Sequence, residues 1–186
     1  FSSGLVYEPG KFADIDELAA LAAEMASSGG LYATHMRNEG TKLPDSVREA
    51  IEIGRRAGVP VQISHHKAAG REAWGLVRES LRLIEAAQAE GLDVHADQYP
   101  FTAGSTILAA IVQNGAFESG PNALGSIAPE DVVIASAAKR PDFEGRSIAA
   151  PAQDLGRSAR EAALRVLEPS PGVTAGMHSM NEDDGG

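Results

Sequence analysis

Apolar and polar residues follow one repeated pattern over the first half of the chain: an amphipathic helix, a glycine, a short apolar strand and a polar cluster. Apolar residues at helical spacing predict helices over residues 15–25, 44–57 and 74–90. Each helix is followed by a glycine, which suits the left-handed turn that commonly ends a helix, at Gly29, Gly58 and Gly91. The strands predicted next are residues 31–33, 59–63 and 92–96. Leu21 and Leu81 are expected on buried helix faces, and Trp74 is interpreted as a helix-packing residue.

The spacing of the polar clusters indicates one βα unit per repeat. His35 and His65 are 30 residues apart, and Asp97 follows 32 residues after His65. A strand, a helix and their loops take about 30 residues, and strands that alternate with helices predict a parallel sheet. A doubly wound sheet fits this spacing as well. Because the polar clusters fall at the carboxyl ends of the strands, where barrel enzymes build their sites, we favour an α/β fold that is part of a (β/α)8 TIM-type barrel.

The repeated pattern breaks from about Thr106, where glycine and proline become frequent. Ser158 and Glu161 have the spacing of a capping box, which predicts the start of another helix. Two further strands are predicted at residues 132–136 and 173–177. The chain divides accordingly into βα units over residues 1–105, an inserted, lid-like segment over 106–172, and a truncated return towards the barrel over 173–186.

Length and composition narrow the function. The chain has 186 residues and begins with Phe1, whereas a complete barrel typically needs roughly 250 residues, so we expect a piece of a longer chain. A net charge of −10 argues against a nucleic-acid partner, and no uncharged apolar run approaches the ~18 residues of a membrane helix. Because the chain has no cysteine, a metal site must use His, Asp or Glu. The expected location is the cytoplasm; the oligomeric state is not predicted.

Two polar clusters share a motif of hydroxyl residue, histidine, any residue and base. They are Thr34-His35-Met36-Arg37 and Ser64-His65-His66-Lys67. Neighbouring parallel strands run about 4.8 Å apart, so the imidazoles of His35 and His65 could converge on one metal ion, with their nearest nitrogens roughly 3–4.5 Å apart. The alternative is two unrelated histidines, one capping a strand and one buried and hydrogen-bonded.

Four segments of the chain resemble a known family. FSSGLVYEPG, LYATHMRNEG, VPVQISHHKAAG and ADQYPFTAGST occur in the order and at the spacings of D-aminoacylases and of the N-acyl-D-glutamate and N-acyl-D-aspartate deacylases. These enzymes belong to the amidohydrolase superfamily. The resemblance is dense over residues 1–106 and weaker beyond. It implies an internal fragment covering about strands 4–7 of a (β/α)8 barrel, with an inserted segment.

The resemblance also implies roles for individual residues. His35 and His65 would be ligands of a tightly held Zn2+, on strands five and six of the barrel. Lys67, Tyr99 and Ser105 would hold the carboxylate of the substrate, and an ammonium, a phenol and a hydroxyl can all donate to that group. The alternatives are a lysine in a solvated loop, a tyrosine packed beside its proline, and a serine in an ordinary turn.

A second set of residues aligns with the acyl pocket of the family. Met177, His178 and Met180 fall in the matching segment, where flexible methionine side chains suit an apolar tail. Val6 and Tyr7 would line the same pocket. Plain core packing is the alternative for the methionines.

Other polar residues receive structural interpretations. His66 is adjacent to His65, so its side chain should point elsewhere and pack, and His95 lies inside a strand. Asp97 would orient the site or form structural hydrogen bonds. Arg37 would meet substrate or form an ion pair with Glu39, and the sequence does not decide between these.

The resemblance implies that the parent enzyme hydrolyses the amide bond of N-acyl-D-amino acids with a zinc-activated water, and that its partner is this small-molecule substrate. The chain has no HxH motif. The aspartate expected as general base lies beyond its C-terminus, and Asp183 and Asp184 precede that position. The fragment itself is therefore expected to be inactive. The alternatives are another amidohydrolase, such as a hydantoinase- or dihydroorotase-like cyclic amidase, and a non-catalytic fragment or pseudoenzyme.

Overall fold

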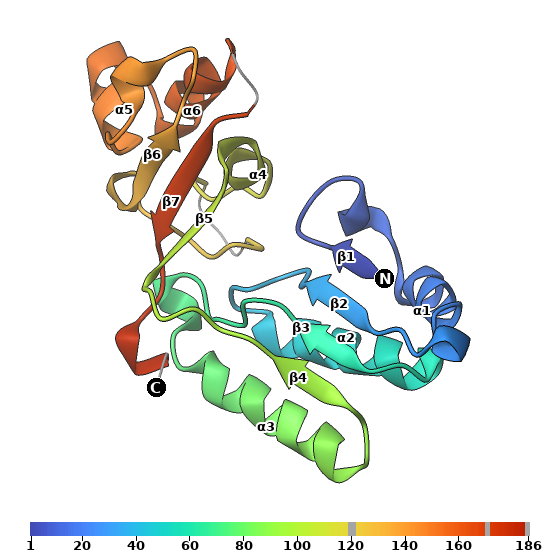
Figure 1. Ribbon diagram of the computed structural model, residues 1–186. Helices are drawn as coiled ribbons and strands as arrows, with labels where there is room; N and C mark the ends of the chain where they lie inside the picture. Colours follow the sequence, from blue (N-terminus) through green and yellow to red (C-terminus); the bar gives the residue numbers. More distant parts are fainter. Residues whose placement is uncertain (119–121, 170–171, 185–186) are drawn as a thin grey trace.

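Two separate hydrophobic cores organise the chain into two α/β bodies, shown at the bottom and top of Figure 1. The computed structural model describes residues 1–118, 122–169 and 172–184. The first core lies between a parallel sheet and the helices that cover it, and the second lies within a smaller antiparallel sheet and its helices. The α/β class predicted from the sequence is therefore confirmed.

The first body contains a four-stranded sheet in the order β1-β2-β3-β4, in which each pair of neighbours is parallel. The strands are β1 (Ser2–Gly4), β2 (Tyr32–His35), β3 (Val61–Ile63) and β4 (Val94–Ala96). Helices alternate with them: α1 (Ile15–Ala23), α2 (Leu43–Ala57) and α3 (Leu76–Ala89). The three predicted repeats are present, and β1 adds a strand ahead of them.

Local capping explains where these helices begin and end. Asp14 accepts a hydrogen bond from the backbone N–H of Glu17 at 2.8 Å, which satisfies a free N–H group in the first turn of α1. Gly58 ends α2 in the left-handed conformation, with a φ of 66° that glycine adopts at little cost. One turn earlier, a Cβ on Gly54 would lie 2.1 Å from a methyl carbon of Val61. Gly54 therefore allows α2 to lie close against β3.

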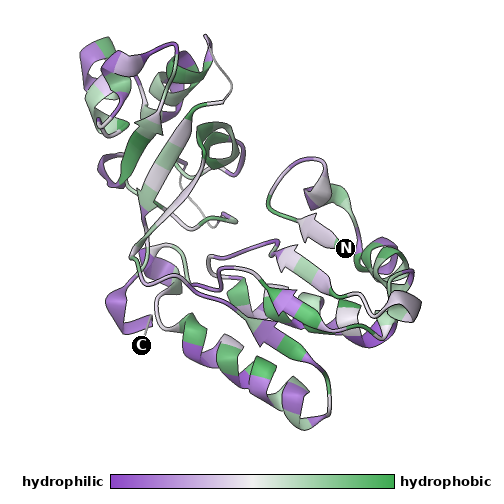
Figure 2. Cartoon of the chain, in the orientation of Figure 1, coloured by the Kyte–Doolittle hydropathy of each residue, from purple (hydrophilic) through white to green (hydrophobic). Residues whose placement is uncertain are grey.

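Three residues expected in the packing of helix faces lie elsewhere. Leu21 and Leu81 are 47% and 41% exposed, and Trp74 precedes α3 and is 40% exposed. The buried stripe of α3 includes Ser80 instead of Leu81, which turns Leu81 towards solvent. Figure 2 shows hydrophilic and hydrophobic residues alternating along α3, as expected for a helix with one buried face. The indole N–H of Trp74 donates to the carbonyl of Ser179 at 3.0 Å.

The second body is built on an antiparallel sheet in the order β5-β7-β6. Its strands are β5 (Ala103–Ile107), β6 (Val132–Ser136) and β7 (Thr174–His178), and its helices are α4 (Leu108–Gln113), α5 (Ala149–Leu155) and α6 (Ala159–Leu167). Ser158 and Glu161 form the predicted capping box at the start of α6. Because β5 and β7 pair with each other, this sheet includes residues from two segments that the sequence analysis placed outside the insertion. Residues 103–105 were assigned to the βα units, and residues 174–178 to the return towards the barrel.

The last described residues return to the first body. The carbonyl of Ser179 accepts from the N–H of Gly70 at 2.9 Å, and both carboxylate oxygens of Asp184 lie 3.0 Å from the N–H of Gly75. Figure 1 accordingly places the C-terminal segment beside the start of α3. Among the described residues, no helix combines the length and apolar character needed to cross a membrane.

Candidate metal and substrate site

The carboxyl ends of β2 and β3 bring two histidines together. His35 is the last residue of β2, and His65 follows the end of β3 by two residues. Their ring centroids are 4.6 Å apart, and Nδ1 of His35 lies in direct contact with Nε2 of His65. The two imidazoles converge as predicted, although their nitrogens lie closer than the roughly 3–4.5 Å expected for two ligands of one tetrahedral ion.

An unusual backbone conformation directs the ring of His65. Its φ of 42° is the only positive value at a non-glycine residue in the described part of the chain. Asp97, just after β4, holds this turn: its Oδ1 accepts from the N–H of His65 at 2.7 Å, and its carbonyl accepts from the N–H of His66 at 2.8 Å. Gln62 donates to the other carboxylate oxygen of Asp97 at 2.7 Å. Strained residues of this kind gather at functional sites, where neighbouring contacts hold them.

Behind His65 lies a buried carboxylate that the sequence analysis did not identify as a site residue. Glu39 is only 4% exposed. Its Oε2 lies 2.7 Å from Nζ of Lys67, and its Oε1 lies 3.1 Å from Nδ1 of His65. Lys67 also donates to the carbonyl of His65 at 3.0 Å. In the sequence, the signal for Glu39 was an acid four residues after a histidine at the end of a strand.

The charges of this cluster follow from its burial. Burial alone would raise the pKa of the Glu39 carboxyl, but the ammonium of Lys67 and the hydrogen bond from His65 outweigh it, so the pKa is lowered. Burial lowers the pKa of His35, and the neighbouring imidazole of His65 lowers it further. The cluster therefore combines an ionised carboxylate with a neutral imidazole, which is the form of histidine that binds metal ions.

Arg37 has a structural role in the first body. Its guanidinium donates to Glu49 through Nε and Nη2, at 3.0 and 2.8 Å. It also donates to the carbonyls of Lys11 and Ala13, at 2.7 and 2.8 Å. These contacts tie the segment before α1 to α2, and the ion pair with Glu39 considered from the sequence does not form.

A cavity of about 250 Å³ adjoins the cluster, and Lys67, Tyr99 and Met180 are among its lining residues. The hydroxyl of Tyr99 donates to Sδ of Met180 at 3.6 Å, and Nζ of Lys67 lies 5.9 Å from the centre of the Tyr99 ring. Burial raises the pKa of Tyr99 to about 12, so its phenol stays protonated at neutral pH. Glu182 and Asp184 also line the cavity. Three of the residues predicted to bind substrate therefore lie together.

The remaining predicted substrate residues are divided between two environments. The ring of Tyr7 lies edge-on to His35 at 6.3 Å, and its hydroxyl hydrogen-bonds to that of Thr106 at 3.0 Å. Ser105 is exposed on β5, opposite Gly176 of β7. Met177 is 4% exposed and packs in the second core, as the packing alternative describes, and its place in an acyl pocket stays a prediction.

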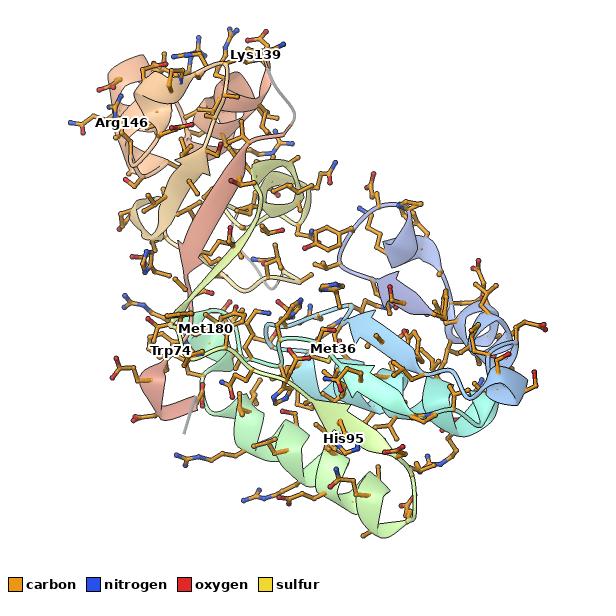
Figure 3. All side chains as sticks on the ribbon, in the orientation of Figure 1. Met36, Trp74, His95, Lys139, Arg146 and Met180 are labelled. Carbon is orange, nitrogen blue, oxygen red and sulfur yellow. The ribbon has the colours of Figure 1, made fainter. Side chains whose placement is uncertain are left out.

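Two other predicted acyl-pocket residues also differ in their surroundings. Val6 is buried in the same second core, whereas His178 is exposed at the end of β7. Met180, two residues further on, lies at the junction of the two bodies, near Trp74 (Figure 3). Of the predicted methionine pair, only Met180 therefore faces the cavity.

The other histidines have the structural roles interpreted from the sequence. His66 is 2% exposed, and its Nε2 lies 2.8 Å from the hydroxyl of Ser80 on α3. His95 is exposed on β4, away from the junction of the two bodies, and pairs with Asp93 at 2.8 Å (Figure 3). Neither contributes a nitrogen to the His35–His65 pair.

The donor set fits part of a zinc site. Zinc accepts imidazole nitrogens as ligands, and its histidines usually have a carboxylate or carbonyl on the other ring nitrogen, as His65 has in Glu39. Within residues 1–118, 122–169 and 172–184, no group of three His, Cys, Asp or Glu residues could hold a metal ion. Because zinc sites need about four ligands, His35 and His65 would supply about half of one.

Comparison with curated proteins gives relatives of one kind, although no protein-family model matches the chain. The chain is 46% identical to a D-aminoacylase from Alcaligenes xylosoxydans xylosoxydans over 107 residues, which are 58% of this chain and 22% of that protein. It is 36% identical to an N-acyl-D-glutamate deacylase from the same organism over 166 residues, which are 89% of this chain and 31% of that protein.

Solved structures give the same result. One match is the N-acyl-D-glutamate deacylase from Bordetella bronchiseptica, with a TM-score of 0.85 and 32% identity over 99% of this chain and 35% of that one. That structure is complexed with zinc and with a phosphonate that mimics the tetrahedral intermediate of the reaction. A D-aminoacylase described as defining a novel subset of amidohydrolases matches with a TM-score of 0.82 and 34% identity, over 98% of this chain and 35% of that one. The chain thus spans about a third or less of the length of these relatives.

Proposed function

Because the chain belongs to the D-aminoacylase family, we propose that its parent protein hydrolyses the amide bond of N-acyl-D-amino acids, releasing a carboxylate and a free D-amino acid. The observation that carries this proposal is the convergence of His35 and His65 beside Lys67 and Tyr99. It occurs in a segment whose fold is similar, over 99% of its length, to that of a deacylase complexed with zinc.

The family also supports a finer description of the fold. We propose that the parallel sheet of the first body is about strands 4–7 of a (β/α)8 barrel. The division into residues 1–105, 106–172 and 173–186 stays a prediction, and the pairing of β5 with β7 supports an insertion that begins and ends a few residues from those boundaries. A cytoplasmic location also stays a prediction.

In this proposal His35 and His65 would hold zinc through the nitrogens that face each other, Nδ1 of His35 and Nε2 of His65. When bound there, zinc would supply polarisation of the amide carbonyl and a lowered pKa, towards about 7, for a bound water. Asp97 keeps the His65 turn in its strained conformation through the hydrogen bond to the backbone N–H. The general base would be an aspartate outside this chain, so the segment alone is expected to be inactive.

Substrate binding would fall to Lys67, Tyr99 and Ser105, which would donate to the carboxylate of the amino acid, and to Tyr7 and Met180 on the acyl side. The pKa of about 12 at Tyr99 supports this role, because a protonated phenol can donate to a carboxylate at neutral pH. Lys67 is already paired with Glu39. Its ammonium would therefore contribute a directed hydrogen bond and little net charge.

The proposal is tested by three histidine variants of the parent protein. His35→Ala and His65→Ala should remove bound zinc and nearly all hydrolysis of N-acetyl-D-amino acids, because each deletes a proposed ligand. His95→Ala is the matched control, since this exposed histidine pairs only with Asp93 among the described residues, and it should keep both. Stoichiometric zinc in the His35 and His65 variants would refute the ligand assignment. A wild-type protein that binds zinc but turns over no N-acyl-D-amino acid would favour the pseudoenzyme alternative.

A further inference from the structure

The carboxylate of Glu39 contacts two residues of the proposed site with two different oxygens. Oε1 faces Nδ1 of His65 at 3.1 Å, and Oε2 faces Nζ of Lys67 at 2.7 Å. The side chain of Glu39 is 5% exposed and that of Lys67 is 9% exposed. Removing two charges from water is costly, and a buried ion pair is by itself weak evidence of a stabilising role. A contribution to stability alone therefore does not explain why Glu39 and Lys67 are buried together.

The backbone around Glu39 is anchored on both sides. Its N–H donates to the carbonyl of Ala123 at 2.8 Å, and its carbonyl accepts from the N–H of Ala69 at 2.7 Å. The next residue, Gly40, is packed so closely that an added Cβ would lie 2.9 Å from the carbonyl oxygen of Asn122. These contacts hold the carboxylate behind His65 and leave it little freedom to move.

The contacts of Lys67 decide which tautomer of His65 suits this carboxylate. Nδ1 of His65 has two neighbours, Oε1 of Glu39 at 3.1 Å and Nζ of Lys67 at 3.0 Å, so it can donate to the carboxylate or accept from the ammonium. The ammonium already has two oxygen acceptors, Oε2 of Glu39 at 2.7 Å and the carbonyl of His65 at 3.0 Å, whereas Oε1 faces Nδ1 as its donor. A proton on Nδ1 satisfies that oxygen. It also leaves Nε2, which contacts His35, with a free lone pair.

We propose that Glu39 is a positioning residue: it fixes His65 as the Nδ1–H tautomer with Nε2 directed at His35, and it holds the ammonium of Lys67 beside Tyr99. The inference rests on the proposed function and assigns to Glu39 the outer carboxylate that orients many zinc-binding histidines. The side chain of Glu39 thus contacts both the proposed metal site, at His65, and the proposed carboxylate-binding site, at Lys67.

Glu39→Gln tests the inference in the parent protein. An amide has one acceptor and one donor end, so it cannot accept from His65 and Lys67 through separate oxygens. Loss of such a supporting carboxylate typically weakens metal binding 10- to 100-fold, and we expect this increase in the zinc Kd, measured by competition with a chelator. Glu39→Asp keeps the charge on a shorter side chain and should recover part of the affinity.

Glu49→Gln is the matched control, because Glu49 also forms a partly buried ion pair in the first body, with Arg37. It should lower the free energy of unfolding but leave the zinc Kd within about twofold of wild type. An unchanged zinc Kd in Glu39→Gln, or an equal loss of zinc affinity in Glu49→Gln, would overturn the proposal. A wild-type protein that binds no zinc would instead overturn the proposed function.

A measurement on the zinc-free wild-type protein is independent of how well any variant folds. Long-range 15N–1H correlation spectra of the imidazole rings identify which nitrogen carries the proton. We expect the Nδ1–H tautomer for His65 and loss of its predominance in Glu39→Gln. An Nε2–H tautomer of His65 in the wild type would contradict the positioning role even if zinc binds.

Discussion

The carboxylate of Asp97 accepts the backbone N–H of His65 at 2.7 Å and thereby ties the turn after β3 to the end of β4. The turn needs this support because His65 has a positive φ, a conformation that costs a non-glycine residue of the order of 1–3 kcal/mol. The relationship couples two adjacent polar clusters that the sequence presents 32 residues apart.

Asp97→Ala in the parent protein should lower the free energy of unfolding by about 0.5–1.5 kcal/mol, the usual net worth of a hydrogen bond, and should also weaken zinc binding. Asp97→Asn keeps one oxygen for the N–H of His65 and should lose less of both. Urea denaturation and a zinc titration measure the two effects. Equal zinc affinity in Asp97→Ala and wild type would show that the turn does not depend on this carboxylate.

Tyr99→Phe should keep zinc but lose catalytic efficiency. The change removes one hydroxyl and preserves the ring, and a charged partner left without its hydrogen bond costs about 1–3 kcal/mol. This corresponds to roughly 5- to 150-fold in kcat/KM. Steady-state kinetics with metal analysis decides the matter: a variant with unchanged kcat/KM would make Tyr99 a packing residue only.

The raised pKa of Tyr99 predicts a dependence of stability on alkaline pH. Burial raises this pKa from 10.0 to about 12, so between these values the phenol ionises more readily in the unfolded chain than in the folded one. Ionisation of Tyr99 in the unfolded chain should thus lower the free energy of unfolding as the pH rises from about 10 to about 12, and should have no such effect at lower pH. The difference in unfolding free energy between wild type and Tyr99→Phe, measured at several pH values, should change over that interval; a constant difference would refute it.

Met177 and Met180 should separate stability from substrate binding. Met177 is buried in the second core, so Met177→Ala should lower the free energy of unfolding by about 2–5 kcal/mol with little change in KM. Met180 contacts the hydroxyl of Tyr99 beside the cavity, so Met180→Ala should mainly change KM, most for substrates with long acyl chains. The opposite pattern of stability and KM would place the acyl pocket at Met177.

The features predicted well from the sequence depend on neighbours in the chain. The capping box of Ser158 and Glu161, the glycine end of α2 at Gly58 and the strand-end position of His35 are local, and parallel pairing then brings His35 and His65 together. The burial of Glu39 could not be predicted in this way, because it depends on contacts with Lys67 and with Ala123 of the second body.

The errors have the same origin. Ser80 and Leu81 lie three and four residues after the buried Val77, so helical periodicity allows either of them beside the buried stripe of α3. In the structure Ser80 is buried against His66, and Leu81 is 41% exposed. The burial of Met177 also depends on distant contacts, because its side chain packs in a core formed with β6, a strand more than 40 residues earlier in the chain. Sequence alignment places a residue in a strand without stating which side of the sheet it faces.

The hydrogen bond from Glu39 to Ala123 has a consequence for protein engineering and for natural variation in length. A loop of the second body supplies the acceptor for the backbone of a buried residue in the first, and Gly40 packs against the same loop. Shortening the second body to obtain a minimal catalyst would therefore leave a buried N–H without its acceptor, directly beside the proposed zinc ligands. A trimmed variant, or a natural relative without this segment, would need another acceptor for that N–H.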